Sequence, residues 1–283
     1  MPHQLTSNSY GKSRVRMTKV IRNGSRHDLL EFAVEVSLEG AFDASYETGD
    51  NSAVVATDSI KNTVYVLAKE HDFTEPEAFA IILARHFVDT YDQVTDATVS
   101  IEQSNWTRID DHDHAFTNGG SDTRTCTVVL SGDDETGGDP IVMGGVAGLL
   151  VLKTTASEFH TFVDDRYRTL ADAHDRIFAT TVDATWRIAD HHVEFGTTYE
   201  NAKRALLKVF AGHHSLAVQQ TLLQMGRDVL DACPAIEEIG LEMPNQHRIP
   251  MNLDPFGLTN DNEIFMATDE PYGLITGTVT RGD

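Results

Sequence analysis

The sequence LLEFAVEVSLEG, residues 29–40, shows strong alternation of apolar and polar side chains, interrupted at Ala33. Such alternation predicts a β-strand with one buried face and one exposed face. The apolar face comprises Phe32, Val34, Val36 and Leu38, and the opposite face comprises Glu31, Glu35, Ser37 and Glu39. The chain is therefore expected to build sheets that are covered on one side only.

The neighbouring segments extend this strand into a larger unit. SRVRMTKVIR (13–22) precedes it, and the turn-forming NGSRHD (23–28) between them predicts an antiparallel hairpin. Two amphipathic helices follow, and strands return in DATVSIEQSNWTRI (96–109) and TRTCTVVLSG (123–132). The apolar faces of the helices comprise Ile60, Val64 and Leu67 in the first and Phe79, Ile82, Leu83, His86 and Phe87 in the second.

The same order of elements recurs after the acidic, glycine-rich GDDETGGDP (132–140). Extended stretches at 141–155 and 182–189 precede two more helices, and strands return at 236–253 and 263–281. The apolar helix positions are Tyr199, Ala202, Leu206, Val209 and Phe210, then Val218, Leu222, Met225 and Val229. We therefore predict an α+β chain with two copies of a strand-strand-helix-helix-strand-strand unit, residues 1–137 and 138–283.

Each predicted sheet is antiparallel, carries helices on one face and leaves its edge strands unpaired. Edge strands need covering or pairing, and closure of several sheets into a barrel would achieve this. We therefore expect a symmetric homo-oligomer.

The composition excludes several classes of protein. The chain has 22 Lys and Arg against 44 Asp and Glu, a formal net charge of −22, so nucleic acid is not an expected partner. The acidic residues are spread along the sequence, which leads us to expect a source with high internal salt, the alternative being an ordinary acidic enzyme. No apolar run is long enough to span a membrane, and the N-terminal residues do not resemble a signal peptide.

The two cysteines, Cys126 and Cys233, lie far apart and have no neighbours at metal-ligand spacing. They are expected to be small buried apolar residues in a reducing cytoplasm. The predicted location is cytoplasmic.

Thr57, Asp58 and Ser59 stand where an extended stretch changes into the first helix. All are good N-cap residues, so a side-chain cap is the simplest expectation. The free amides of a helix start can also bind an anionic or carbonyl-bearing ligand.

The other candidate motifs are weak. His112, Asp113 and His114 in DHDHAF would point both imidazoles to one face of a strand and could bind a metal, but no supporting ligand follows. The histidine pairs of AGHHSLAVQQ and ADHHVEF are weaker still. The glycine stretches lack the spacing of a phosphate-binding loop.

The stretch LLVLKTTASEFHTFVDDRYRTLADAHDR, residues 149–176, resembles the signature of the urate oxidase (uricase) family. The matching positions are Lys153, Thr154, Thr155, Phe159, Phe162, Tyr167, Leu170 and Arg176. The segments YGKSRVR, VVATDSIKNTVY, DHDHAF, SLAVQQT, MPNQH and PYGLI resemble uricase segments in the expected order. The family's tunnelling fold agrees with the duplicated unit predicted above.

The resemblance implies oxidation of urate by molecular oxygen to 5-hydroxyisourate and hydrogen peroxide, with no metal and no organic cofactor. It implies that Phe159 stacks on the purine, Arg176 and Gln219 bind one edge with the Val218 backbone, and Leu170 lines the pocket. Asn245 would hold oxygen or water above the ring. The backbone amides of Thr57 and Asp58 would bind the far edge.

The resemblance also implies a proton relay of Lys12, the Thr57 hydroxyl and His247. In the family the two sets of residues come from neighbouring subunits, which implies a homotetramer. Gln246 and Arg248 depart from the residues that relatives often carry there, and the C-terminal residues TVTRGD lack a peroxisomal signal. The alternatives are a zinc-dependent tunnelling-fold pterin or purine hydrolase that uses His112 and His114, and a non-catalytic urate-binding homologue.

Overall fold

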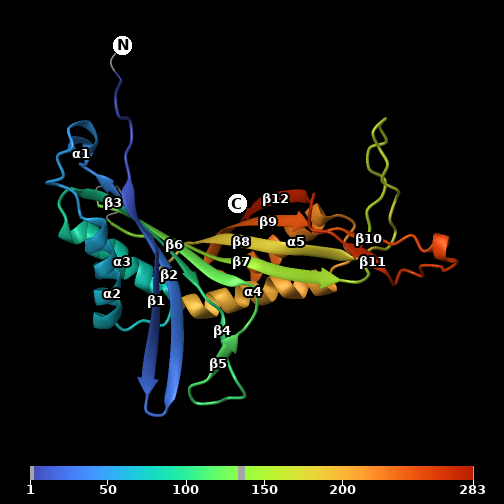
Figure 1. Cartoon of the computed structure of the whole chain (residues 1–283), viewed down its shortest axis with the longest axis horizontal. Coiled ribbons are helices and arrows are strands. Elements are labelled where there is room, and N and C mark those ends of the chain that lie inside the picture. The colour runs from blue at the N-terminus through green and yellow to red at the C-terminus, as the bar shows by residue number, and fades with distance from the viewer. Residues whose placement is uncertain (1–2, 133–137, 283) are drawn as a thin grey trace. The chain divides into compact units, whose positions relative to one another are not determined.

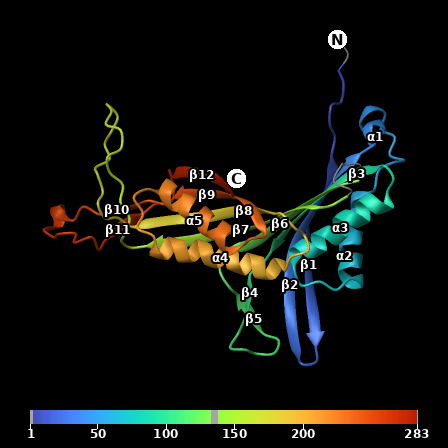
Figure 2. The same ribbon diagram turned by 180° about the vertical axis from the view of Figure 1, so that it is seen from behind.

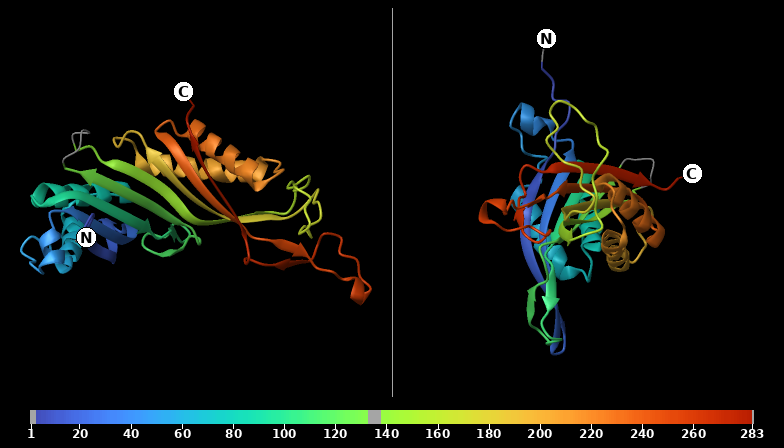
Figure 3. Two further views of the ribbon diagram at one scale, coloured as in Figure 1. Left: turned by 90° about the horizontal axis from the view of Figure 1, so that it is seen from above. Right: turned by 90° about the vertical axis from the view of Figure 1, so that its right-hand side faces the viewer.

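The computed structural model describes residues 3–132 and 138–282, and Figures 1, 2 and 3 show the chain from several directions. The chain divides into two compact units, Met1–Gly145 with Arg187–Gly196, and Val146–Trp186 with Thr197–Asp283. The predicted division after residue 137 falls outside the described residues and stays a prediction.

The first unit is an antiparallel sheet with the strand order β1-β2-β3-β6. Its elements are β1 (Tyr10–Asn23), β2 (Arg26–Gly40), α1 (Asp43–Glu47), α2 (Thr57–Glu70), α3 (Pro76–Thr90), β3 (Val94–Gln103), β4 (Trp106–Arg108), β5 (Phe116–Asn118) and β6 (Thr123–Ser131). The alternation predicted for β2 is confirmed, because Phe32, Val34, Val36 and Leu38 are buried. Helices α2 and α3 lie side by side (Figure 2).

The core of the first unit lies between this sheet and its helices. Helix α2 packs on β1, and α3 packs on β3 and β6. Phe79, Leu83 and Phe87 of α3 are fully buried, and the Phe79 ring stacks on that of Phe73 at 4.3 Å. Gly11 permits the close approach of β1 to β2, since a Cβ atom there would lie 1.8 Å from the Val36 carbonyl oxygen.

A buried ion pair also lies in the first unit. Glu77, at the start of α3, is only 1% exposed, and its carboxylate lies 2.6 Å from the Arg124 guanidinium of β6. Burial raises the pKa of Glu77, although the charge of Arg124 opposes this.

The second unit repeats the order of two strands, two helices and further strands, as predicted. Its elements are β7 (Ile141–Lys153), whose residues from Val146 belong to this unit, β8 (Phe178–Ile188), α4 (Phe195–Gly212), α5 (Val218–Ala232), β9 (Ile236–Asn245), β10 (Arg248–Pro250), the 3₁₀ turn η1 (Asp254–Phe256), β11 (Phe265–Ala267) and β12 (Gly273–Thr280). Figure 3 shows α4 and α5 on one side of these strands. Gly226 lets α5 sit directly on β12, because a Cβ atom there would lie 2.5 Å from a methyl carbon of Val279.

Some predicted strands are shorter than expected. The long strand in the stretch at 96–109 ends at Gln103. The next residue, Ser104, donates its backbone amide to the Glu31 carbonyl, and the chain then continues in the β4–β5 hairpin. The stretch at 236–253 likewise divides into β9 and β10, and that at 263–281 into β11 and β12. The short α1 was not predicted.

The predicted side-chain cap of α2 is wrong. The N-cap residue is Ala56, which forms no side-chain hydrogen bond, and Thr57 is already the first helical residue. The Asp58 carboxylate instead accepts hydrogen bonds from the side chains of Lys61, at 2.5 Å, and Asn62, at 3.0 Å, within the helix. The amides of the first turn therefore have no cap from these side chains.

Cys126 and Cys233 are both buried, as predicted, and burial raises the pKa of each thiol. Within the described ranges, no helix is long and apolar enough to cross a membrane.

Candidate active site

Backbone hydrogen bonds in the second unit tie together the segments that carry Phe159 and Arg176. Phe159 and Ala173 exchange a pair of bonds, of 2.8 and 2.9 Å. The Arg176 amide donates to the Ser157 carbonyl, at 2.9 Å, and Ser157 forms a bridge with Ser215 just before α5. Residues that are distant in sequence are thereby held in one place.

The motif residues Lys153 and Thr155 support this arrangement and do not enter the pocket described below. The Lys153 ammonium donates to the His213 carbonyl, at 2.6 Å, and burial lowers its pKa. The Thr155 hydroxyl donates to the Asp175 carboxylate, at 2.9 Å. The signature therefore describes a supporting framework as well as a pocket.

A pocket of about 200 Å³ lies beside these segments in the second unit. Its lining includes five of the predicted site residues, Phe159, Leu170, Arg176, Asn245 and His247. Leu170 is 60% exposed, so it lies at the margin of the pocket. An aromatic ring, a guanidinium, a carboxamide and an imidazole are thus brought together.

Arg176 has the character of a ligand-binding cation. Its guanidinium carbon lies 5.2 Å from the centre of the Phe159 ring. Its Nε is buried and has no hydrogen-bond partner among the described residues, and burial lowers the pKa of the guanidinium. A buried donor without a partner costs free energy, so such an arrangement favours a ligand that accepts its hydrogen bond.

Asn245 and His247 reach the pocket in a way that the sequence did not predict. The strand predicted at 236–253 includes both residues, but β9 ends at Asn245. Beyond this end, the Gln246 amide donates to the Ala179 carbonyl of β8, at 2.9 Å, and the Gln246 side chain donates to the Thr181 hydroxyl, at 3.0 Å. Gln246, which departs from the family pattern, therefore holds the chain between Asn245 and His247 against β8.

Val218 and Gln219 begin α5, next to the bridged segment. Val218 is 4% exposed and packs in the core, so its backbone is the part available to a ligand. Gln219 is exposed to solvent. Neither residue lines the 200 Å³ pocket.

Lys12, Thr57 and Asp58 lie in the first unit. Lys12 precedes an irregularity in the pairing of β1 with β2, and Thr57 begins α2, which packs on β1. The pKa of Asp58 is lowered mainly by its hydrogen bond to Lys61, with a smaller contribution from the charge of Lys12. Lys12 therefore lies close enough to the start of α2 to influence its first turn.

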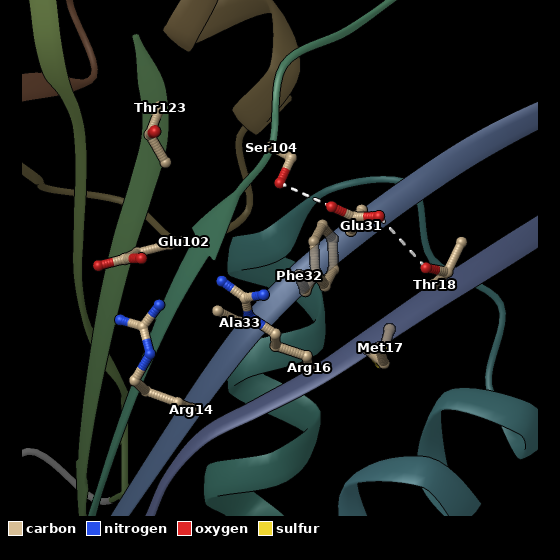
Figure 4. Close-up of a pocket in the computed structure, with 10 residues that line it drawn as sticks. All are labelled: Arg14, Arg16, Met17, Thr18, Glu31, Phe32, Ala33, Glu102, Ser104 and Thr123. Carbon is tan, nitrogen blue, oxygen red and sulfur yellow. Dashed lines mark hydrogen bonds between the residues drawn. The ribbon is translucent and has the colours of Figure 1, made fainter. Parts of the chain in front are cut away.

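A second pocket, of about 280 Å³, lies on the sheet of the first unit (Figure 4). Its lining is mixed in charge, with Arg14 and Arg16 beside Glu31 and Glu102, and Glu31 accepts a hydrogen bond from Ser104. Its one aromatic residue, Phe32, is 1% exposed and offers no ring face to a ligand. This pocket therefore suits a flat anion less well.

The predicted arrangement of His112 and His114 is wrong. They lie in the loop between β4 and β5, not in a strand, and their rings meet edge to face at 4.6 Å. The Nδ1 atom of His112 accepts the His114 amide, at 3.3 Å. Among the described residues, the clusters with metal-binding geometry lie elsewhere, so the zinc hydrolase alternative loses its proposed ligands.

Known proteins resemble this chain in both sequence and structure. The uricase family model matches residues 8–129 and 142–276. The uricase of Arthrobacter globiformis is 45% identical, over 98% of this chain and 90% of the relative, and that of Dictyostelium discoideum is 36% identical, over 98% and 97%. The crystal structure of uricase from Arthrobacter globiformis superposes with a TM-score of 0.95 at 44% identity and covers 99% of this chain and 96% of that one. The chain therefore belongs to the uricase family.

Proposed function

We propose that this protein is a urate oxidase that converts urate, oxygen and water into 5-hydroxyisourate and hydrogen peroxide without a metal or organic cofactor. The observation that carries the proposal is the pocket that combines the Phe159 ring with the Arg176 guanidinium, whose buried Nε has no partner among the described residues. Family membership makes urate the expected ligand.

The proposed binding mode follows from the shape and charge of urate, a flat anion with acceptors around its edge. The Phe159 ring stacks on the purine, and Arg176 donates a fork of hydrogen bonds to one edge. Gln219 and the Val218 backbone bind the same edge from the start of α5. Leu170 covers the margin of the pocket.

In the proposed reaction, deprotonated urate gives two electrons to oxygen. One oxygen atom of water is added to the purine as a hydroxyl group, and dioxygen is reduced to peroxide. Protons leave urate and water and reach the peroxide, so a path for them is needed. We assign this path to Lys12, the Thr57 hydroxyl and His247, and we assign to Asn245 the holding of oxygen or water.

We further propose that the site is shared between chains of a homotetramer whose sheets close into a barrel. The backbone amides of Thr57 and Asp58 from one chain would bind the far edge of urate in the pocket of another. The exposed edge strand β12 supports an assembly, because Leu274 is 56% exposed on it.

The reaction is tested with chelator-treated protein in high salt. Loss of urate absorbance, oxygen uptake and peroxide production are followed together, and equal amounts of all three are expected. Urate that binds without being consumed would favour the non-catalytic homologue. Activity that chelation abolishes and zinc restores would favour a metal-dependent enzyme.

The shared site is tested by mixing variants. Arg176→Ala and Thr57→Val chains are each expected to be nearly inactive, but co-expressed chains should form mixed pairs in which one site is intact. Random pairing gives about a quarter of the wild-type number of sites. A mixture no more active than its parents would show that each site lies within one chain.

A further inference from the structure

The bridged segments that carry Phe159 and Arg176 have a second side. Phe159, Ala173 and Asp175 line the pocket, whereas Glu158, His160 and His174 do not. Successive side chains of extended segments point to opposite sides. The side chains that alternate with the pocket residues are those of Glu158, His160 and His174.

These three side chains form a compact cluster. Their potential ligand atoms all lie within 4.8 Å of one another, and Glu158 Oε2 lies 2.9 Å from His160 Nε2. The rings of His160 and His174 are 4.7 Å apart and inclined by 35°. Ligands of tetrahedral zinc lie roughly 3.4 Å from one another, so small side-chain rotations suffice to enclose an ion.

A fourth residue orients the carboxylate from outside the cluster. His214, from the segment before α5, hydrogen-bonds Glu158 Oε1 through Nε2, at 2.6 Å. The other oxygen of Glu158 thus faces His160 and His174. A ligand carboxylate that is fixed by an outer hydrogen bond is a regular feature of protein metal sites.

We propose that Glu158, His160 and His174 form a zinc(II) site, with His214 as its outer hydrogen-bonding partner. Two imidazoles and one carboxylate suit a borderline divalent ion better than calcium or magnesium. Glu158 and His160 are half-buried and His174 is exposed, which leaves a path for the ion. A net charge of −22 favours cations near the protein.

Bound zinc would link the segment around residue 159 to the segment around residue 174. Between them lies a run, residues 161–172, with little regular secondary structure. The ion would therefore stabilise the frame of the pocket from behind without entering it. Zinc in this position is separate from the proposed reaction, which uses no metal.

The other cluster with metal-binding geometry provides the matched control. Asp190, His191 and His192 are sequence neighbours, and the Asp190 carboxylate already accepts the His192 amide, at 2.9 Å. No outer residue orients this carboxylate in the described part of the chain. The variant His192→Ala should therefore leave zinc binding unchanged.

The experiment uses the full chain, stripped with a chelator and titrated with zinc chloride in a calorimeter in the absence of urate. We expect one zinc ion per chain, confirmed by metal analysis after gel filtration. His174→Ala and Glu158→Gln should weaken binding by about tenfold or more, and His214→Gln by about tenfold. Zinc should also slow proteolysis within residues 161–172 in the wild type and in His192→Ala, but not in His174→Ala.

Circular dichroism confirms that each variant is folded, and the exposed position of His174 makes His174→Ala the least disruptive of them. Absence of stoichiometric zinc binding to the wild type would overturn the proposal. So would binding that survives His174→Ala and is lost in His192→Ala. Because no urate is present, this outcome is independent of whether the protein oxidises urate.

Discussion

Replacement of Arg176 tests the proposed substrate clamp most directly. Its guanidinium lies 5.2 Å from the centre of the Phe159 ring, and Nε has no partner among the described residues. Arg176→Ala therefore removes this buried, unpartnered donor together with the rest of the guanidinium that we propose binds urate. Hydrogen bonds to a charged group contribute about 1.5–3 kcal/mol each, so loss of a two-bond fork costs about 3–6 kcal/mol.

Converted at about 1.4 kcal/mol per factor of ten, this loss lowers kcat/KM for urate by roughly 10² to 10⁴. Arg176→Lys keeps the charge but not the planar fork, and we expect an intermediate loss of about 10-fold to 100-fold. Initial rates of urate consumption give kcat/KM. Equilibrium binding of urate without oxygen separates the loss of affinity from the loss of chemistry.

Arg168 is the matched control. It lies in the same loop, its guanidinium carbon is 4.3 Å from the Phe162 ring centre, and it pairs with Asp172 at 2.8 Å. It is outside the pocket lining. Arg168→Ala should change kcat/KM less than about threefold. An equal loss in both variants, or a loss below fivefold in Arg176→Ala, would refute the reasoning.

Further expectations concern the relay, the buried ion pair and the surface charge. Thr57→Val should lower kcat by about 10² or more while urate binding is largely retained, and Thr57→Ser should recover much of the rate. Both rates are measured by stopped flow. Full activity of Thr57→Val would exclude a relay through the Thr57 hydroxyl. Arg124→Met should cost about 3–5 kcal/mol of unfolding free energy in urea at pH 8, because it leaves the charge of Glu77 buried. Burial raises the folded-state pKa of Glu77, so the protonated form of Glu77 favours folding, and that contribution is lost as pH rises through this pKa. The loss of unfolding free energy in Arg124→Met should therefore be smaller at pH 5 than at pH 8. Unfolding free energy should rise from dilute buffer to molar potassium chloride, and a flat response would contradict the predicted high-salt source.

Period-two alternation was sufficient to predict the sheets, because burial on one face leaves a regular pattern in β2 and its neighbours. It did not predict where strands stop. The predicted stretches at 96–109 and 236–253 continue past Gln103 and Asn245, where β3 and β9 end, so the local pattern carries no signal for these ends. The missing cap of α2 has a local origin, since the Asp58 carboxylate accepts hydrogen bonds from Lys61 and Asn62 within the helix instead of capping its first turn.

The residues of the candidate site also differ in how they are distributed along the sequence. All the site residues were identified through the family resemblance, but Phe159, Leu170 and Arg176 lie in one continuous signature stretch, whereas Asn245 and His247 lie in a separate short segment. The cluster behind Phe159 was missed, although the order Glu158, Phe159, His160 carries a signal. Polar residues on both sides of a pocket aromatic indicate a second functional face when the segment is extended.

The acidic surface and the proposed anionic substrate place opposite demands on this protein. A net charge of −22 repels urate at a distance, while Arg176 attracts it at contact. Salt separates the two effects, because the screening length falls to about 3 Å at 1 M. This length is much shorter than the distances between surface charges and an approaching urate ion, but it is comparable with the length of a hydrogen bond inside a pocket. High salt therefore weakens the repulsion more than the binding. The same ions that relieve self-repulsion in the fold also ease the approach of the substrate, so stability and apparent affinity for urate should improve together as salt rises.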